Sequence, residues 1–174
     1  MNFIKHLKTV MKHRIVVRNL CFKLGLYWQG LTHDLSKYSF EEFWLGVKYY
    51  QGYRSPHEGE REDYGYSKAW MHHKGRNKHH FEYWNDVSMT TKKYEPIEMP
   101  IKYVKEMFCD RIGACKIYKG DNYTDASAFE YFQRGNAKNI MHPNTAKLTY
   151  EWLEMLKDKG EKYTFDYIKM NYPN

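Results

Sequence analysis

A histidine followed directly by an aspartate, His33-Asp34, is the pair of residues in this chain whose types best suit metal chemistry. The imidazole offers a neutral nitrogen ligand, and the carboxylate offers two oxygens that can bridge two metal ions. Leu31 and Leu35 surround the pair, and Lys37 follows three residues after the aspartate. A His-Asp dipeptide is common as a capping or salt-bridge pair without function, so its meaning depends on the residues that accompany it.

Four further histidines follow in two adjacent pairs, His72-His73 and His79-His80. Ser67 is expected to cap a helix that ends with the first pair, Gly75 and Asn77 to supply left-handed residues, and a second helix to begin near His79. Such a turn would gather up to four imidazoles, of which two or three could reach a metal pair. Three basic residues would place positive charge at the mouth of the site: Lys74, Arg76 and Lys78.

Two predicted amphipathic helices supply one further candidate ligand each. In residues 3–24, His13 shares the apolar stripe and is expected to face inward, whereas His6, two turns earlier, is expected to be exposed near the helix end. In residues 101–117, Asp110 lies on an apolar stripe, where burying a carboxylate is costly unless it is paired or binds a metal. Asp110 is therefore the natural partner of Asp34.

The order of these residues resembles the HD-domain superfamily of metal-dependent phosphohydrolases, whose signature is an isolated His, then His-Asp, then further His, then a distant Asp. The resemblance covers about residues 6–118 and is one of motif order. It is carried by His13, by Thr-His-Asp-Leu-Ser-Lys at 32–37, by the histidines of 72–80, and by Cys-Asp-Arg-Ile-Gly-Ala at 109–114. The chain also looks similar to a group of small bacterial and phage proteins.

The resemblance implies an all-α, single-domain helical bundle over residues 1–174, with a metal site between core helices. It implies that a first divalent metal is held by His13, His33, Asp34 and Asp110. Asp34 would bridge to a second metal held by two or more of His72, His73, His79 and His80. Mixed nitrogen and oxygen donors suit Mn, Fe, Co, Ni or Zn, with Mg possible, and their number is enough for one or two ions.

The activity implied is hydrolysis of a small anionic phosphorylated substrate, such as a nucleotide, by water that the metal activates. Asp34, Lys37 and Arg76 are the catalytic candidates, and Lys37, Lys74, Arg76 and Lys78 are the candidates for binding phosphate oxygens. A di-iron oxygenase is an alternative, because some members of the superfamily use the same ligand types to activate O₂. The sequence does not separate these two activities, because they share their ligands.

A function of another class is a basic nucleic-acid-binding module without catalysis. The formal net charge of +7 favours anionic partners, and 18% of the residues are aromatic. Tryptophan and tyrosine could stack on bases while lysine and arginine hold phosphates. A histidine-rich basic turn around residues 72–80 would fit this function as well.

Composition sets the remaining bounds. At 174 residues, with 42% hydrophobic and 28% charged residues, the chain is expected to form one globular domain. No apolar run approaches the roughly 20 residues of a membrane span, and no signal peptide is recognisable, so we expect a cytoplasmic protein without a membrane partner. Three cysteines without a Cys-x-x-Cys spacing predict neither a disulfide framework nor a zinc knuckle.

The segments between these motifs are expected to be supporting structure. Ser39 and Glu42 form a capping-box pattern that predicts a helix from about Phe40 to Tyr50. Residues 53–66 are expected to be a surface loop, a candidate lid, with His57 in solvent. Residues 90–100 are expected to be a linker, and the last helices are expected near 125–132, from 144 to a stop at Lys159-Gly160, and over 164–170.

Overall fold

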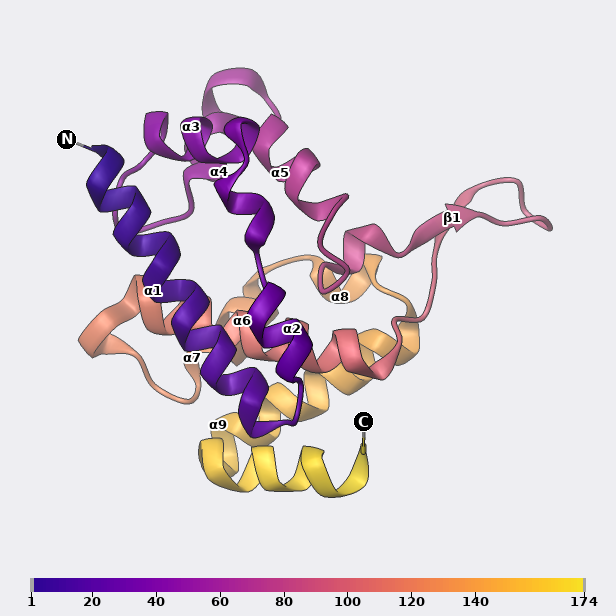
Figure 1. Cartoon of the computed structure of the whole chain (residues 1–174). Coiled ribbons are helices and arrows are strands. Elements are labelled where there is room, and N and C mark those ends of the chain that lie inside the picture. Colours follow the sequence, from indigo (N-terminus) through magenta and orange to yellow (C-terminus); the bar gives the residue numbers. More distant parts are fainter. Residues whose placement is uncertain (1, 174) are drawn as a thin grey trace.

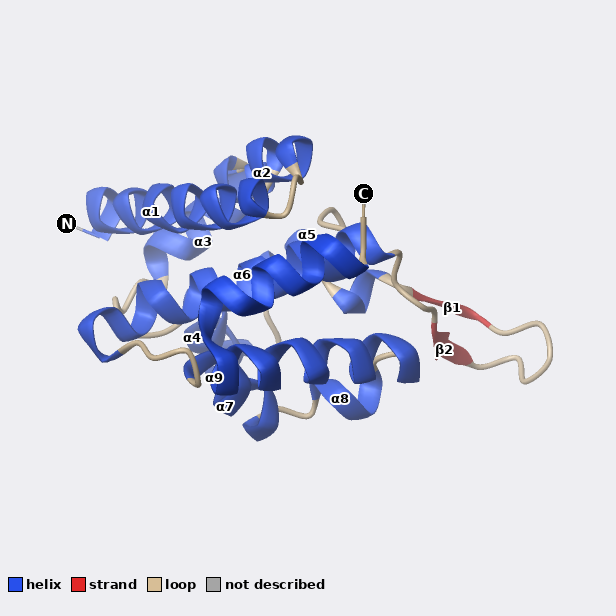
Figure 2. Ribbon diagram, turned by 90° about the horizontal axis from the view of Figure 1, so that it is seen from below, coloured by secondary structure: helices blue, strands red, loops and turns tan. Residues whose placement is uncertain are grey.

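The computed structural model describes residues 2–173 of the chain. Two long helices, α1 (Asn2–Lys23) and α6 (Ile101–Lys119), pack against each other through the centre of the molecule (Figure 1). Figure 2 shows α1 and α2 on one side of α6, and α7, α8 and α9 on the other. The all-α, single-domain prediction is confirmed, since the described chain is mostly helical around a shared core. Within residues 2–173, no helix combines the length and the apolar character needed to cross a bilayer.

The remaining elements are short apart from the last helix. The other α-helices are α2 (Tyr27–Thr32), α3 (Phe40–Lys48), α4 (Pro56–Tyr64), α5 (Lys68–Lys74), α7 (Ser127–Arg134), α8 (Ala137–Ile140) and α9 (Pro143–Asn171). Three 3₁₀ turns cover Leu35–Tyr38, Phe81–Tyr83 and Gly120–Asn122. The core forms where α1, α6, α7 and α9 meet, with Phe108, Trp152 and Leu156 among its fully buried side chains.

The apolar stripe of α1 is buried as its spacing predicts. Val10, His13, Val17 and Leu20 all lie on the buried face. The prediction that His6 is exposed was wrong, because its ring lies on the same stripe and is only 7% exposed. The ring packs so closely on Gly46 of α3 that a Cβ there would lie 2.3 Å from its Nε2 atom.

Helix α9 contains the interruption that the Lys159-Gly160 pair predicts. Gly160 has φ 81° and ψ 169°, which is not a helical conformation, and the two halves of α9 run on either side of it. Only glycine adopts this region readily, because it has no Cβ. The stop therefore depends on one residue, Gly160.

The prediction of a loop over residues 53–66 was wrong, because most of this segment is α4. Pro56 occupies the first turn, where a missing N–H has no cost, and Gly65 ends the helix with φ 76°. The sequence hides this helix because its residues are mostly charged and form no apolar stripe. Glu60 is buried and accepts hydrogen bonds from the Ser67 hydroxyl and the Lys68 backbone N–H, which ties α4 to the start of α5.

His57, on the same helix, does not lie in solvent as expected. Its ring centroid is 5.4 Å from that of Trp70, and its Nδ1 atom is 3.3 Å from the Ser67 hydroxyl. The pKa of His57 lies well below its usual value, mainly because the ring is buried and secondly because of the charge of His73. The segment is thus packed helical structure rather than an irregular surface loop.

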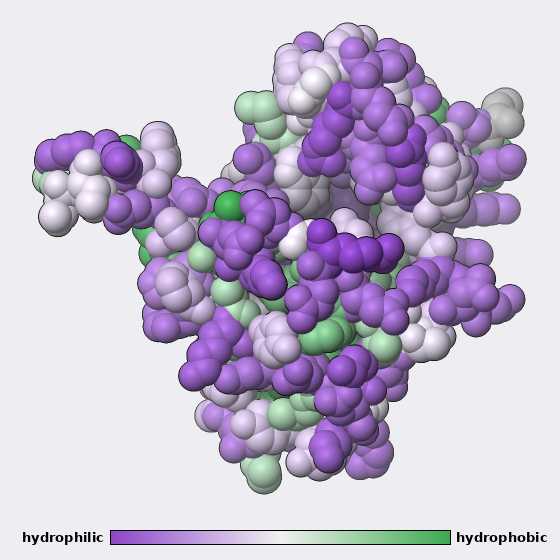
Figure 3. All heavy atoms as spheres, turned by 180° about the vertical axis from the view of Figure 1, so that it is seen from behind, coloured by the Kyte–Doolittle hydropathy of each residue, from purple (hydrophilic) through white to green (hydrophobic). Residues whose placement is uncertain are grey.

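The expected linker contains a two-stranded hairpin instead. Strands β1 (Asn85–Val87) and β2 (Tyr94–Pro96) pair antiparallel, and the hairpin projects from the helical body (Figures 1 and 2). Both strands are largely exposed, so no alternation of polar and apolar residues marks them in the sequence. Figure 3, seen from behind, shows the hairpin beside a surface dominated by hydrophilic residues.

Smaller differences concern the ends of elements. Helix α3 stops at Lys48, short of the predicted end at Tyr50, and α2 ends at Thr32, directly before the His-Asp pair. Gly75 ends α5 in a right-handed conformation, with φ −74°, rather than in the left-handed conformation expected for the turn between the histidine pairs. The helix expected from His79 is only the 3₁₀ turn Phe81–Tyr83.

Candidate metal centre

The His-Asp pair lies at a sharp reversal of the backbone between α2 and the following 3₁₀ turn. Asp34 adopts the left-handed conformation, with φ 55° and ψ 28°, which is uncommon for a residue other than glycine although aspartate tolerates it better than most. Arg14 of α1 donates from Nε to the His33 carbonyl oxygen at 2.8 Å and from Nη2 to the Leu31 carbonyl oxygen at 3.1 Å. These bonds fix the reversal to α1, and the side chains of His33 and Asp34 are both buried.

The carboxylate of Asp34 lies between two sets of imidazoles. Its Oδ2 atom is 3.4 Å from Nε2 of His13 and 3.4 Å from Nε2 of His33. Its Oδ1 atom is 3.3 Å from Nε2 of His73 and 3.4 Å from Nε2 of His79. One carboxylate thus presents a separate oxygen to each set, which is the arrangement of a bridging ligand.

The first set is completed by α6. Asp110 places Oδ1 3.0 Å from Nε2 of His13 and 3.5 Å from Nε2 of His33. The ligand atoms of His13, His33, Asp34 and Asp110 all lie within 4.8 Å of one another. Two imidazoles and two carboxylates in this space could hold a divalent ion.

The second set comes from α5 and the turn that follows it. His73, His79 and His80 each offer one nitrogen that lies within 4.8 Å of the other ligand atoms of this set, which also includes Asp34. Within residues 2–173, the Nε2 atoms of His79 and His80 are buried and have no hydrogen-bond partner. Because unsatisfied buried polar atoms are costly, a ligand that engages them is chemically expected, and a metal ion suits this nitrogen-rich set.

A buried glutamate of α6, Glu106, orients one histidine from each set. Its Oε1 atom lies 3.0 Å from Nδ1 of His33 and 3.1 Å from Nδ1 of His79. A carboxylate that accepts from Nδ1–H fixes the tautomer and leaves Nε2 free to bind a metal. Glu106 therefore turns both Nε2 atoms toward Asp34.

A second glutamate, Glu42 of α3, does the same for His73. Its Oε2 atom lies 2.7 Å from Nδ1 of His73, and its Oε1 atom lies 2.6 Å from Nδ1 of His72. The other nitrogen of His72 lies 2.6 Å from Glu41. The structure therefore does not bring His72 into either set, because carboxylates engage both of its ring nitrogens.

The charges of the centre compensate one another. Burial opposes the ionised forms of Asp34 and Asp110, but neighbouring cationic groups, including His33, lower the pKa of both carboxyls well below their usual range. Burial also opposes the charged form of His33, yet the surrounding carboxylates raise its pKa well above the usual value. His80 differs from His33, because its pKa lies well below that of a free imidazole. The main cause is burial, and the charges of His79 and His73 add to it.

Residues 2–155 match a family that is described as a family of unknown function, DUF5662. The chain belongs to this family. No curated protein and no solved structure matches the chain. In this member of DUF5662, buried groups of histidine, aspartate and glutamate that could hold metal ions are therefore the main guide to function.

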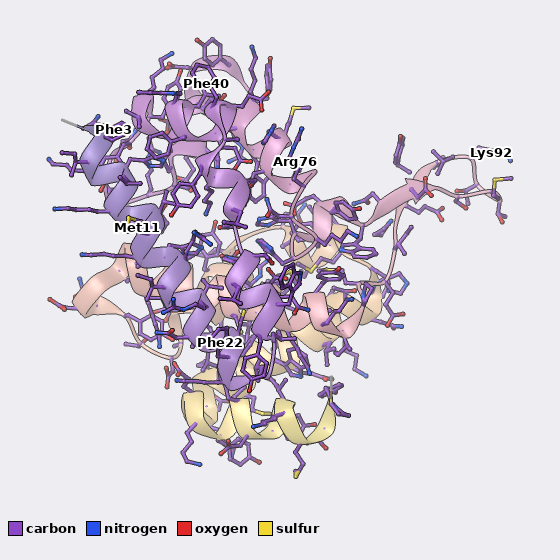
Figure 4. The ribbon with its side chains drawn as sticks, in the orientation of Figure 1. Phe3, Met11, Phe22, Phe40, Arg76 and Lys92 are labelled. Carbon is purple, nitrogen blue, oxygen red and sulfur yellow. The ribbon has the colours of Figure 1, made fainter. Side chains whose placement is uncertain are left out.

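A cavity of about 370 Å³ opens beside the centre of this DUF5662 protein, with His79 and Glu106 in its wall. Arg76 and Lys78 line it too, and Figure 4 shows Arg76 at the end of α5. Lys74 is not among the lining residues. The ammonium group of Lys37 instead lies inside the centre, where Nζ is 2.6 Å from Oδ2 of Asp34.

Three residues that shape the centre are not among the candidates that the sequence indicates: Arg14, Glu42 and Glu106. Glu106 had a detectable signal, because it lies one helical turn before Asp110 and so on nearly the same face of α6. Glu42 was read only as part of a capping box. Its backbone N–H does bond the Ser39 hydroxyl, but its carboxylate binds the histidines of α5. Arg14 gave no signal, because its partners are backbone carbonyl groups.

Proposed function

We propose that this protein is a metal-dependent phosphohydrolase or phosphodiesterase acting on a small phosphorylated substrate. The observation that supports it most is the position of Asp34, whose two carboxylate oxygens face two different sets of histidines. The order His13, His33-Asp34 and Asp110, similar to that of HD-domain hydrolases, supports the same activity. Divalent ions bound there would supply an activated water molecule and positive charge for the transferred phosphoryl group.

Several residues of the chain would act directly on such a substrate. The Lys37 ammonium group lies 2.6 Å from Oδ2 of Asp34, so it could bind a phosphate oxygen placed near Asp34. Arg76 and Lys78 line the adjoining cavity and could hold other anionic groups. Lys74 lies outside the lining, so its contribution would be limited to long-range attraction of anions.

The experiment is a phosphate-release assay on the purified, untagged protein, reconstituted separately with Mn²⁺, Fe²⁺, Co²⁺, Ni²⁺, Zn²⁺ and Mg²⁺. Substrates should include phosphomonoesters, phosphodiesters and nucleotides. We expect turnover with at least one metal, and we expect Asp34→Ala and His79→Ala to abolish it. The matched control is Asp166→Ala, which changes an exposed carboxylate of α9. Turnover that survives in the metal-free Asp34→Ala variant would contradict the proposal.

A di-iron oxygenase is the second candidate, favoured by the nitrogen-rich second set of ligands. The same donors could hold two iron ions, and the difference in activity would lie in the surrounding groups. Oxygen uptake by the Fe²⁺-loaded protein, without phosphate release from any substrate, would decide for this function. Salt-sensitive nucleic-acid binding that survives loss of His33 and His79 would instead decide for a binding module.

A further inference from the structure

We propose that the cavity beside the metal centre binds the non-reacting part of the substrate and selects a ligand that combines a planar ring with a second anionic group. This inference rests on the proposed function, since it describes which phosphorylated compound the same site would take. It assigns the selection to two residues outside the metal centre, Lys102 at the start of α6 and Trp28 of α2, both of which line the cavity.

The charge of the cavity exceeds what one phosphate group requires. Three cationic residues line it, Arg76, Lys78 and Lys102, and all three are exposed. Among the described residues that line it, Glu106 is the one acidic residue, and its carboxylate is engaged by His33 and His79. The cations therefore have no carboxylate of the wall to neutralise them, and an anionic group of a ligand would do so.

These cations also lie apart from the group that would hold the reacting phosphate. Lys37 and Asp34 lie at the centre, whereas Lys102 belongs to the first turn of α6, one helical turn before Glu106. The Lys102 ammonium group lies 5.1 Å from the centroid of the Tyr103 ring, a cation–π contact at the wall of the cavity. An anion that Lys102 contacts would thus be a second group of the same ligand.

The aromatic part of the wall argues for a ring. Trp28 lines the cavity with 74% of its surface exposed, which is unusual for the largest apolar side chain. Tyr103 also lines it, and its ring is supported from the side by Trp84 at a centroid distance of 5.6 Å. A planar group entering the cavity would cover the exposed indole and stack against a supported aromatic surface.

The size and the neutral polar residues of the wall fit the same ligand. About 370 Å³ is at the small end of ligand pockets. Gln29, Thr32 and Asn77 add neutral donors and acceptors that could contact the edge of a ring or a sugar. A lone phosphate would leave most of this wall unused, whereas a compound with one ring system and two anionic groups would cover it.

The test uses phosphonates, which bind without being hydrolysed, so it does not depend on turnover. The probes are phenylphosphonate (a ring and one anionic group), methylenediphosphonate (two anionic groups and no ring) and α,β-methylene adenosine diphosphate (both features). Calorimetric titration of the purified protein is expected to show the third probe binding at least tenfold more tightly than either of the others. Affinities of all three probes within twofold of one another would overturn the inference.

Two variants assign the preference to its residues. Lys102→Ala should weaken the two diphosphonate probes about fivefold to tenfold and leave phenylphosphonate unchanged. Trp28→Ala should weaken the two ring-bearing probes by a similar factor and leave methylenediphosphonate unchanged. The matched controls are Lys169→Ala and Tyr163→Ala, which change exposed residues of α9 and should alter nothing.

Effects no larger than those of the controls would overturn the assignment to Lys102 and Trp28. Both residues are exposed, so the variants are expected to fold, and circular dichroism would confirm this. Because the readout is binding, its failure is distinguishable from failure of the proposed hydrolase, which is measured by phosphate release. The predicted preference without phosphate release would support this cavity and contradict the hydrolase.

Discussion

Replacing Glu106 with glutamine should weaken metal binding about thirtyfold while leaving the fold intact. The carboxylate holds Nδ1 of His33 at 3.0 Å and Nδ1 of His79 at 3.1 Å, so one side chain positions a ligand in each metal set. Glutamine has the same shape and can still offer one oxygen, but it has no charge. Each charge-assisted hydrogen bond that becomes neutral loses about 1 kcal/mol, so two lose about 2 kcal/mol.

Because each ion loses one such bond, the combined loss of about 2 kcal/mol corresponds to a factor of roughly 30 in the overall affinity for the two ions, or about fivefold for each ion. The assay is competition for Zn²⁺ against a chromophoric chelator at fixed pH. Glu151→Gln, at an exposed position of α9, is the matched control and should change the affinity less than twofold.

Zinc affinity of Glu106→Gln equal to that of the unchanged protein would contradict this role of Glu106. A variant with both lower affinity and a strongly lowered Tm would indicate general loss of structure, and Glu106→Asp would then serve as a second test. Aspartate keeps the charge but is one methylene shorter. It should reach at most one of the two imidazoles and give an intermediate affinity.

Three further predictions concern the stability of the fold and the backbone that holds the His-Asp pair. The pKa of His6 is lowered to about 4, mainly by burial and secondly by the charge of Lys37. The unfolded state therefore binds the proton more readily than the folded state. The free energy of unfolding should fall as pH falls from about 6.5 to 4, by at most about 3 kcal/mol. His6→Asn should flatten this pH dependence in urea titrations, and an unchanged slope would contradict it. Gly160→Ala forces a Cβ into a conformation with φ 81°; it should cost about 1–3 kcal/mol, and calorimetry showing an unchanged Tm would contradict that expectation. Arg14→Ala removes the hydrogen bonds to the carbonyl groups of His33 and Leu31. It should lower the free energy of unfolding by about 1–3 kcal/mol and weaken Zn²⁺ affinity severalfold. The control is Arg18→Ala, and equal Zn²⁺ affinity of the two variants would exclude this positioning role of Arg14.

Local patterns in the sequence were enough to predict the elements that carry the centre. The apolar stripe of α1 placed His13 on the buried face, and Ser39 and Ser67 cap α3 and α5 as expected. Each of these predictions depends on a few neighbouring residues, because helical periodicity and capping are properties of one or two turns. The glycine stop at Gly160 is of the same kind.

Elements without a local signal were missed. Helix α4 has no apolar stripe. It is stabilised by the hydrogen bonds of Glu60 and by the Pro56 and Gly65 residues at its two ends. The hairpin of β1 and β2 has mostly exposed residues on both strands, so its sequence resembles that of a loop. In both cases the pattern that periodicity detects, a continuous apolar face, does not exist in the sequence.

The choice between adjacent histidines also exceeded what the sequence contains. His72 and His73 are neighbours on α5, about 100° apart around the helix axis, so a small rotation decides which one faces Asp34. In the structure Glu42 of α3 binds Nδ1 of both rings, while Nε2 of His72 meets Glu41 and Nε2 of His73 meets Asp34. Tertiary contacts of this kind have no counterpart in local spacing.

The most direct test of the centre is elemental analysis of the untagged protein after reconstitution, beside its Asp34→Ala and Asp166→Ala variants. Because each oxygen of Asp34 faces a separate set of imidazoles, we expect close to two transition-metal ions per chain, retained in Asp166→Ala and lost in Asp34→Ala. Circular dichroism would establish that the Asp34→Ala variant is folded. A protein that stays metal-free after reconstitution, or a folded Asp34→Ala variant that keeps both ions, would contradict the account.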